Sequence, residues 1–212
     1  FPNVGYYASA GGSVNVRAGA LAGSGTISAC GGRATAAGSG GGGRIAVRVT
    51  GDGADFSGFT GDVVATGGVT SASRFGYPGT IYLEKPADNG RGELVIRGSG
   101  TMRSTVYIDS ATIDYRLYAT ELSASCGPST YDFGRVTLTN GAYLGIAADT
   151  TVTFREVVGQ AAANSYIVLL GGTLLLPSGY ALTNTTIAVF KPGSGLHSIG
   201  AAAGADRLAF GS

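Results

Sequence analysis

The stretch GSGGGGRIAVRV, residues 38–49, joins a glycine tract to a run in which apolar and polar side chains alternate. Alternation with a period of two is typical of a β-strand that buries one face. The glycines allow two interpretations, a phosphate-binding loop or a turn before a strand. A dinucleotide-binding fingerprint needs a helix after its glycines, and a P-loop needs Gly-Lys-Ser/Thr. A strand pattern follows this tract, and the sequence contains no Gly-Lys. We therefore predict a structural turn.

Related stretches lie before and after this one. The strand pattern begins at Ser13 in GGSVNVR, at Arg44 in GGRIAVR and at Thr80 in PGTIYLE, so the spacings are 31 and 36 residues. A second motif alternates with the first, as GTISACGG over 25–32 and GDVVATGG over 61–68, again 36 residues apart. Two strand types that recur in a fixed order predict units that stack on one another.

Short runs rich in Val, Ile, Thr and Tyr continue to the C-terminal region, and helical periodicity is nearly absent. We predict an all-β fold, a right-handed parallel β-helix (β-solenoid) with irregular loops. An antiparallel β-sandwich is the alternative, since it also contains many short strands between turns. The ordered recurrence of two motifs favours the β-helix, because a sandwich requires no such recurrence.

We expect residues 1–212 to form one β-solenoid domain, with regular repeats over 11–97 and looser turns over 98–212. The chain begins at Phe1 without a methionine or a signal-peptide pattern, so we expect a fragment of a larger protein that supplies flanking domains. Stacked turns need positive φ and leave little room for a Cβ, and both demands select glycine.

The alternation also predicts which side chains point into a dry core. The inward set is Val14, Val16, Ile27, Ala29, Ile45, Val47, Val49, Ile81 and Leu83. The outward set is Asn15, Ser28, Arg44, Arg48 and Tyr82.

Composition excludes several classes of protein. Charged residues make up 13% and hydrophobic residues 44%, which argues against disorder. The formal net charge of +1 gives no basic field for nucleic acid. No apolar run is long enough for a membrane span. The single histidine, His197, has no metal-ligand neighbours, and the two cysteines, Cys30 and Cys126, are expected to be free and mostly buried thiols. We predict no catalytic residue, no metal site and no cofactor.

The order of motifs GTISACGG, GSGGGGRIAV, GDVVATGG and PGTIYLE is similar to a glycine-rich repeat in very large secreted or cell-surface bacterial proteins. The resemblance covers Gly11 to about Ile96, and more loosely GRVTLTNGAYLGI and GGTLLLPSGYALTNTTIAVF. It implies an extracellular, adhesin-like β-solenoid. It carries no established catalytic residues.

A candidate sugar-contact face lies in TVYIDSATIDYRLYAT, residues 105–120. Alternation places five polar or aromatic side chains outward, Tyr107, Asp109, Asp114, Arg116 and Tyr118. An aromatic face stacks on a pyranose ring, and carboxylate and guanidinium groups bind its hydroxyl or acidic groups. The alternative is a solvated face on which the tyrosines have no ligand. If the face binds a ligand, a polysaccharide or a cell-surface glycan is the expected partner.

The leading functional hypothesis is a non-catalytic extracellular module that acts as a structural scaffold or an adhesin-like surface segment. The alternative is a carbohydrate-active domain: a polysaccharide lyase, a glycoside hydrolase or an attached carbohydrate-binding module. That alternative rests on analogy between folds and on the five candidate residues.

Overall fold

The computed structural model describes residues 8–34, 38–71, 74–98, 119–160, 165–189, 198–201 and 208–209. These residues form an all-β structure in which most strand pairs are parallel, as the sequence predicts. The predominance of parallel pairs does not fit the antiparallel sandwich. The chain divides into two compact units, residues 1–101 and 102–212.

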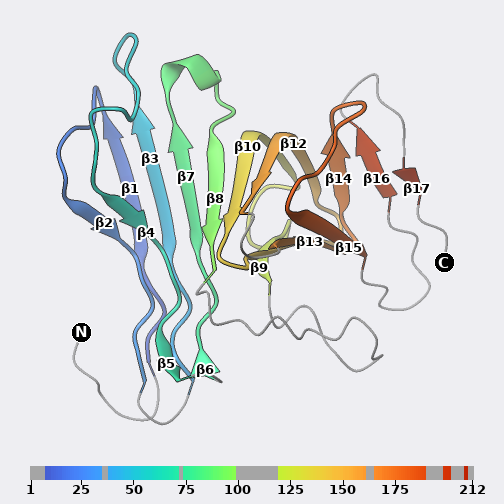
Figure 1. Ribbon diagram of the computed structural model, residues 1–212, viewed down its shortest axis with the longest axis horizontal. Coiled ribbons are helices and arrows are strands. Elements are labelled where there is room, and N and C mark those ends of the chain that lie inside the picture. The colour runs from blue at the N-terminus through green and yellow to red at the C-terminus, as the bar shows by residue number, and fades with distance from the viewer. Residues whose placement is uncertain are drawn as a thin grey trace. The chain divides into compact units, whose positions relative to one another are not determined.

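In the first unit, strands β1 (Ser13–Ala18), β3 (Arg44–Val49) and β7 (Thr80–Glu84) lie side by side in parallel (Figure 1). Strand β2 (Thr26–Ser28) pairs in parallel with β4 (Asp62–Val64). A short antiparallel pair, β5 (Val69–Ser71) and β6 (Arg74–Phe75), follows β4. After the 3₁₀ turn η1 (Pro86–Asp88), β8 (Glu93–Arg97) returns antiparallel to β7.

The register of these strands equals the spacing of the sequence repeats. Ser13 pairs with Arg44 and Arg44 with Thr80, which are the steps of 31 and 36 residues, and Thr26 pairs with Asp62. Equivalent residues of the predicted copies are therefore paired with one another in neighbouring strands.

The predicted inward side chains of the first unit form its core. Ile45, Val47 and Ile81 are at most 2% exposed, and Ala29 and Ala65 join them. Partly buried side chains pack against this cluster, among them Val14, Val16, Ile27, Val63 and Leu83. The predicted outward residues Asn15, Ser28 and Arg44 are exposed, whereas Arg48 and Tyr82 are half-buried because they contact each other.

The second unit contains two parallel sheets. One holds β10 (Thr130–Thr139), β12 (Thr151–Gly159), β14 (Thr173–Leu176) and β16 (Ser198–Ala201), with β17 (Leu208–Ala209) antiparallel at its end. The other has the order β15 (Thr185–Val189), β13 (Ser165–Leu170), β11 (Tyr143–Ala147), β9 (Thr120–Leu122). The fully buried side chains of the second unit come from both sheets and include Val136, Leu138, Leu144, Ile146, Phe154, Ile167 and Leu174.

Turns in the second unit use residues that tolerate a left-handed backbone. Asn140, Asp149 and Asn184 have φ of 54°, 59° and 54°. Asparagine and aspartate adopt this conformation more readily than other non-glycine residues. Asn184 adopts this conformation directly before β15.

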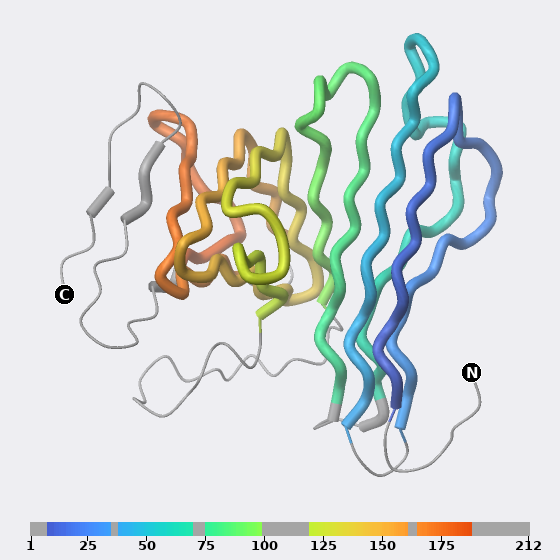
Figure 2. The backbone as a smooth tube through the Cα atoms, turned by 180° about the vertical axis from the view of Figure 1, so that it is seen from behind, coloured from blue at the N-terminus to red at the C-terminus, as the bar shows by residue number. Residues whose placement is uncertain are grey.

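The glycine tract over 38–43 is extended, and the predicted turn is wrong at this position. The tract continues the line of β3, just as residues 8–12 and 76–79 continue β1 and β7 (Figure 2). None of its glycines has φ in the left-handed range, so positive φ is not what selects glycine here.

Hydrogen bonds explain the arrangement of the tract. Gly40 N–H donates to the carbonyl of Gly32 (3.0 Å), and Gly43 N–H donates to that of Ala29 (2.7 Å). Between them, Gly42 N–H donates in another direction, to the carbonyl of Tyr77 (2.7 Å). Gly40 and Gly43, which are three residues apart, thus face the same neighbouring segment. A polyproline II helix also repeats every three residues. The tract is bonded to several backbones around it.

These backbones approach too closely for any side chain. A Cβ on Gly40, Gly42 or Gly43 would overlap the carbonyl oxygen of Ser9, Ala65 or Gly12, respectively. The expectation that glycine is needed because a Cβ has no room is therefore confirmed.

The central position of the tract accounts for its length. Contacts of the tract reach four extended segments, 9–12, 29–32, 65–68 and 76–79. Gly41, whose added Cβ would lie 3.6 Å from the nearest atom, is the least crowded of its four consecutive glycines.

Pro78 marks the end of this hydrogen-bonded row. It occupies the position of Gly11 and Gly42 in the repeat, and both of those glycines donate their N–H to the next segment. Proline has no N–H to donate. The strand after Pro78, β7, is accordingly the last of the parallel set in the first unit, since β8 pairs with it in the antiparallel direction.

We expect Gly42→Ala to lower the free energy of unfolding by about 2 kcal/mol or more, because its Cβ would overlap the backbone of a neighbouring segment that side-chain rotation cannot move. Urea unfolding followed by circular dichroism measures the effect. Gly41→Ala, one residue away, is the matched control and should change stability by less than about 1 kcal/mol. Equal effects of the two substitutions would contradict the close backbone packing.

Candidate functional site

The predicted sugar-contact residues, Tyr107, Asp109, Asp114, Arg116 and Tyr118, lie outside the described residues, as does His197. Their assignment stays a prediction. The candidate site described below comes from a different part of the chain.

A cleft of about 320 Å³ opens on the outer face of the first unit. Its lining comes from three strands and the start of the loop after β7: Arg17, Arg48, Val49, Thr50, Glu84, Lys85 and Pro86. Arg17, Arg48 and Glu84 are register partners in β1, β3 and β7, so they form one column across the sheet. The repeat therefore brings together residues that are far apart in sequence.

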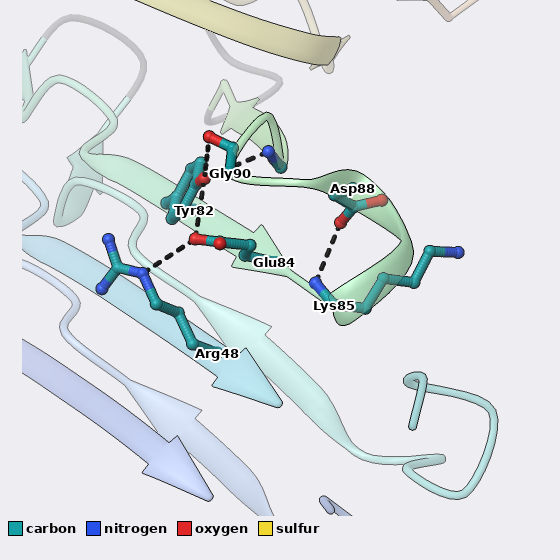
Figure 3. Close-up of polar contacts among 7 residues, drawn as sticks. Arg48, Tyr82, Glu84, Lys85, Asp88 and Gly90 are labelled. Atoms are coloured by element: carbon teal, nitrogen blue, oxygen red, sulfur yellow. Dashed lines mark hydrogen bonds and ion pairs between the residues drawn. The ribbon is translucent and has the colours of Figure 1, made fainter. Parts of the chain in front are cut away.

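Arg48, Tyr82 and Glu84 form a hydrogen-bonded network (Figure 3). Arg48 Nε donates to Glu84 Oε2 at 2.9 Å, and Tyr82 Oη donates to the same oxygen at 2.9 Å. The Arg48 guanidinium lies 5.1 Å from the centroid of the Tyr82 ring, within the range of a cation–π contact. This network holds Arg48 and Glu84 in fixed positions at the cleft.

The loop after β7 completes the network. Gly92 N–H donates to Tyr82 Oη at 3.0 Å. Burial raises the pKa of the Tyr82 phenol; the hydrogen bond from Gly92 lowers it, and the Glu84 carboxylate raises it further. The phenol is thus held in its neutral form, in which it can donate to Glu84.

A local hydrogen bond positions Lys85 at the edge of the cleft. Its backbone N–H donates to Asp88 Oδ2 at 2.9 Å across the 3₁₀ turn (Figure 3), and the turn ends at Asn89 with φ of 50°. The Lys85 charge also acts on Asp55. The pKa of the Asp55 carboxyl is lowered mainly by hydrogen bonds from Ser57, with a smaller contribution from Lys85.

The column of charges is unusual within this chain. Arg17 and Arg48 are direct partners of like charge, a pairing that destabilises a sheet. In the second unit, by contrast, Arg135 pairs with its register partner Glu156 at 2.7 Å. Arg17 is exposed and has no ion pair among the described residues. The cleft therefore combines three cationic side chains with one carboxylate, that of Glu84, which already accepts hydrogen bonds from Arg48 and Tyr82.

Alignment of the repeats could have identified this column. The three copies end in Arg17, Arg48 and Glu84, and the spacings of 31 and 36 residues place them in register. Sequence reasoning placed Arg48 and Tyr82 on the outer face but did not connect them with Arg17 or Lys85.

Both cysteines are free, as predicted. The expectation that both are mostly buried is wrong for Cys126, which is exposed, whereas Cys30 is partly buried. Within the described part of the chain, no group of three or more His, Cys, Asp or Glu side chains is placed to hold a metal ion. No helix in that part has the length and apolar character needed to cross a membrane. No protein-family model, curated protein or solved structure matches this sequence.

We expect Tyr82→Phe to lower the free energy of unfolding by about 1 kcal/mol at pH 7, because Glu84 loses a donor and Gly92 an acceptor. Since the pKa of Tyr82 is raised in the folded state, its stabilising effect is complete below the unfolded pKa of about 10 and is lost as the pH rises through the folded value. The difference between the two proteins should therefore shrink in urea unfolding at alkaline pH.

Tyr166→Phe is the control for this substitution. The Tyr166 ring stacks on Tyr143 at 4.8 Å, and its hydroxyl has no hydrogen bond within the described ranges. Its replacement should leave stability unchanged at both pH values. A Tyr82→Phe protein that unfolds like the parent at pH 7 would contradict the network.

Proposed function

We propose that this chain is a right-handed β-solenoid module of a secreted or cell-surface protein, and that it acts as a non-catalytic scaffold or adhesin-like segment. The observation that carries the proposal is the agreement between the sequence repeat and the strand register in the first unit. Equivalent residues stack directly on one another, which is how a solenoid extends.

The glycine tract supports a structural role for the most distinctive part of the sequence. Its backbone groups bind neighbouring backbones, and at Gly40, Gly42 and Gly43 the space that a side chain would need is taken by carbonyl oxygens. Layers packed in this way have a fixed spacing of about 4.8 Å. A stack of such layers suits a rigid spacer. The resemblance to glycine-rich repeats of large bacterial surface proteins supports the extracellular setting.

Duplicating one repeat tests the solenoid. A second copy of residues 44–79 is inserted after Gly79, and the first copy carries Tyr77→Gly and Pro78→Gly so that its interior segment can donate hydrogen bonds. The longer protein should unfold cooperatively with an increased m-value, since more surface is buried. The matched control keeps Tyr77 and Pro78 in the first copy and should be less stable. A duplicated protein that aggregates or unfolds in two separate transitions in both versions would contradict the solenoid.

A second experiment tests the absence of catalysis. The protein is incubated with a panel of neutral and acidic polysaccharides, and products are followed by reducing ends and by the ultraviolet absorbance of unsaturated uronates. The scaffold role predicts no product above the heat-denatured control. Sustained release of oligosaccharides would overturn it and favour the alternative, a polysaccharide lyase or glycoside hydrolase.

A further inference from the structure

We propose that the cleft between Arg17, Arg48 and Lys85 binds the carboxylate of an acidic polysaccharide, with a uronic acid residue as the bound unit. This proposal goes beyond the scaffold role and does not depend on it, because a ligand can bind to a solenoid that performs no chemistry.

The charges at the cleft favour an anionic ligand. Three cationic side chains line it from β1, β3 and the loop after β7, and the one carboxylate among the lining residues is Glu84. Glu84 already accepts hydrogen bonds from Arg48 and Tyr82. The cleft is therefore cationic although the formal net charge of the whole chain is only +1.

The donors that remain free suit a carboxylate. Arg48 contacts Glu84 through Nε, and Figure 3 shows its two terminal nitrogens pointing away from Glu84. Arg17, its neighbour in the column, is exposed. Guanidinium groups present paired N–H donors that match the two oxygens of a carboxylate. An anion between the two arginines would also relieve the repulsion between these like charges.

The surroundings of the charges suit a sugar. A volume of about 320 Å³ lies at the small end of the range for ligand sites, which is the scale of one monosaccharide unit. Thr50 adds a hydroxyl oxygen to the lining; its proton is donated to the Ala18 carbonyl (3.2 Å), so the oxygen can accept a hydrogen bond from a sugar. The adjacent column of the sheet places the exposed amide of Asn15 and the small side chain of Ala46 beside the cleft. Because the cleft is open, a longer chain can continue across the outer face.

Binding of defined oligosaccharides to the whole chain tests the proposal. Oligogalacturonate is the acidic probe, its fully methyl-esterified form is the neutral counterpart, and isothermal titration calorimetry at low salt measures both. We expect oligogalacturonate to bind and the esterified form to bind at least about tenfold more weakly, since the charge-assisted hydrogen bonds are lost. Raising the salt concentration should weaken the binding of the acidic probe.

Two arginine variants identify the site. Arg17→Gln removes an exposed side chain that forms no ion pair with any described residue, so the fold should persist. The affinity for oligogalacturonate should fall about tenfold. Arg44→Gln is the matched control, because Arg44 is also exposed on the same sheet but lies at the opposite end of β3. The control should bind as tightly as the parent.

Glu84→Gln provides a test in the opposite direction. It removes the internal carboxylate that competes for Arg48, so the affinity for oligogalacturonate should rise severalfold. Thermal unfolding of each variant shows whether the fold is retained.

Several results would overturn the proposal. The first is that oligogalacturonate does not bind at millimolar concentration. The second is that Arg17→Gln and Arg44→Gln lose the same amount of affinity for it, and the third is that a folded Glu84→Gln protein binds it more weakly than the parent. Tighter, Arg17-dependent binding of a sulfated oligosaccharide would reject the carboxylate as the preferred group. Tight binding of inorganic phosphate with equal dependence on Arg17 would reject the sugar.

Discussion

Direct contact between backbones is the constraint on which the first unit depends. In an ordinary parallel sheet, hydrogen bonds run in one plane and side chains separate the sheet from its neighbours. Over residues 38–43 the hydrogen bonds point in several directions, so extended segments surround one another without side chains between them. The arrangement needs glycine at most positions, and it holds the strands that follow, β1, β3 and β7, in one register.

Register is also what creates the candidate site. Once Ser13, Arg44 and Thr80 are aligned at the start of their strands, the residues four positions later, Arg17, Arg48 and Glu84, must meet. Two arginines side by side cost stability unless another charge compensates. Glu84 compensates for Arg48 on one side, and the cleft beside Arg17 leaves space for an external anion on the other. The architecture and the proposed binding chemistry therefore share one cause.

The sequence predicted strands β1, β2, β3, β4 and β7, their parallel register and the core between them, because alternation and repeat spacing are local patterns that tertiary structure preserved. The antiparallel pair β5–β6 and the antiparallel direction of β8 were not predicted, since they lie outside the repeat. The inward positions of Ile45, Val47 and Ile81 follow from a period of two. The conformation of the glycine tract could not be predicted in this way. Glycine is compatible with positive φ and with close packing alike, and only the neighbours from other layers decide between them. The cleft was not predicted because alternation describes the two faces of a single strand and not the columns that run across several strands.

The same comparison shows where parallel pairing ends in the first unit. Gly11 and Gly42 donate hydrogen bonds to the next segment, and Pro78, at the equivalent position of the repeat, has no N–H with which to do so. Tyr77 places a bulky side chain at the position that Gly41 occupies in the second copy. Beyond them the chain reverses through η1, and β8 pairs antiparallel with β7. The two positions at which the third copy departs from the glycines of the second thus lie just before the strand where parallel pairing stops.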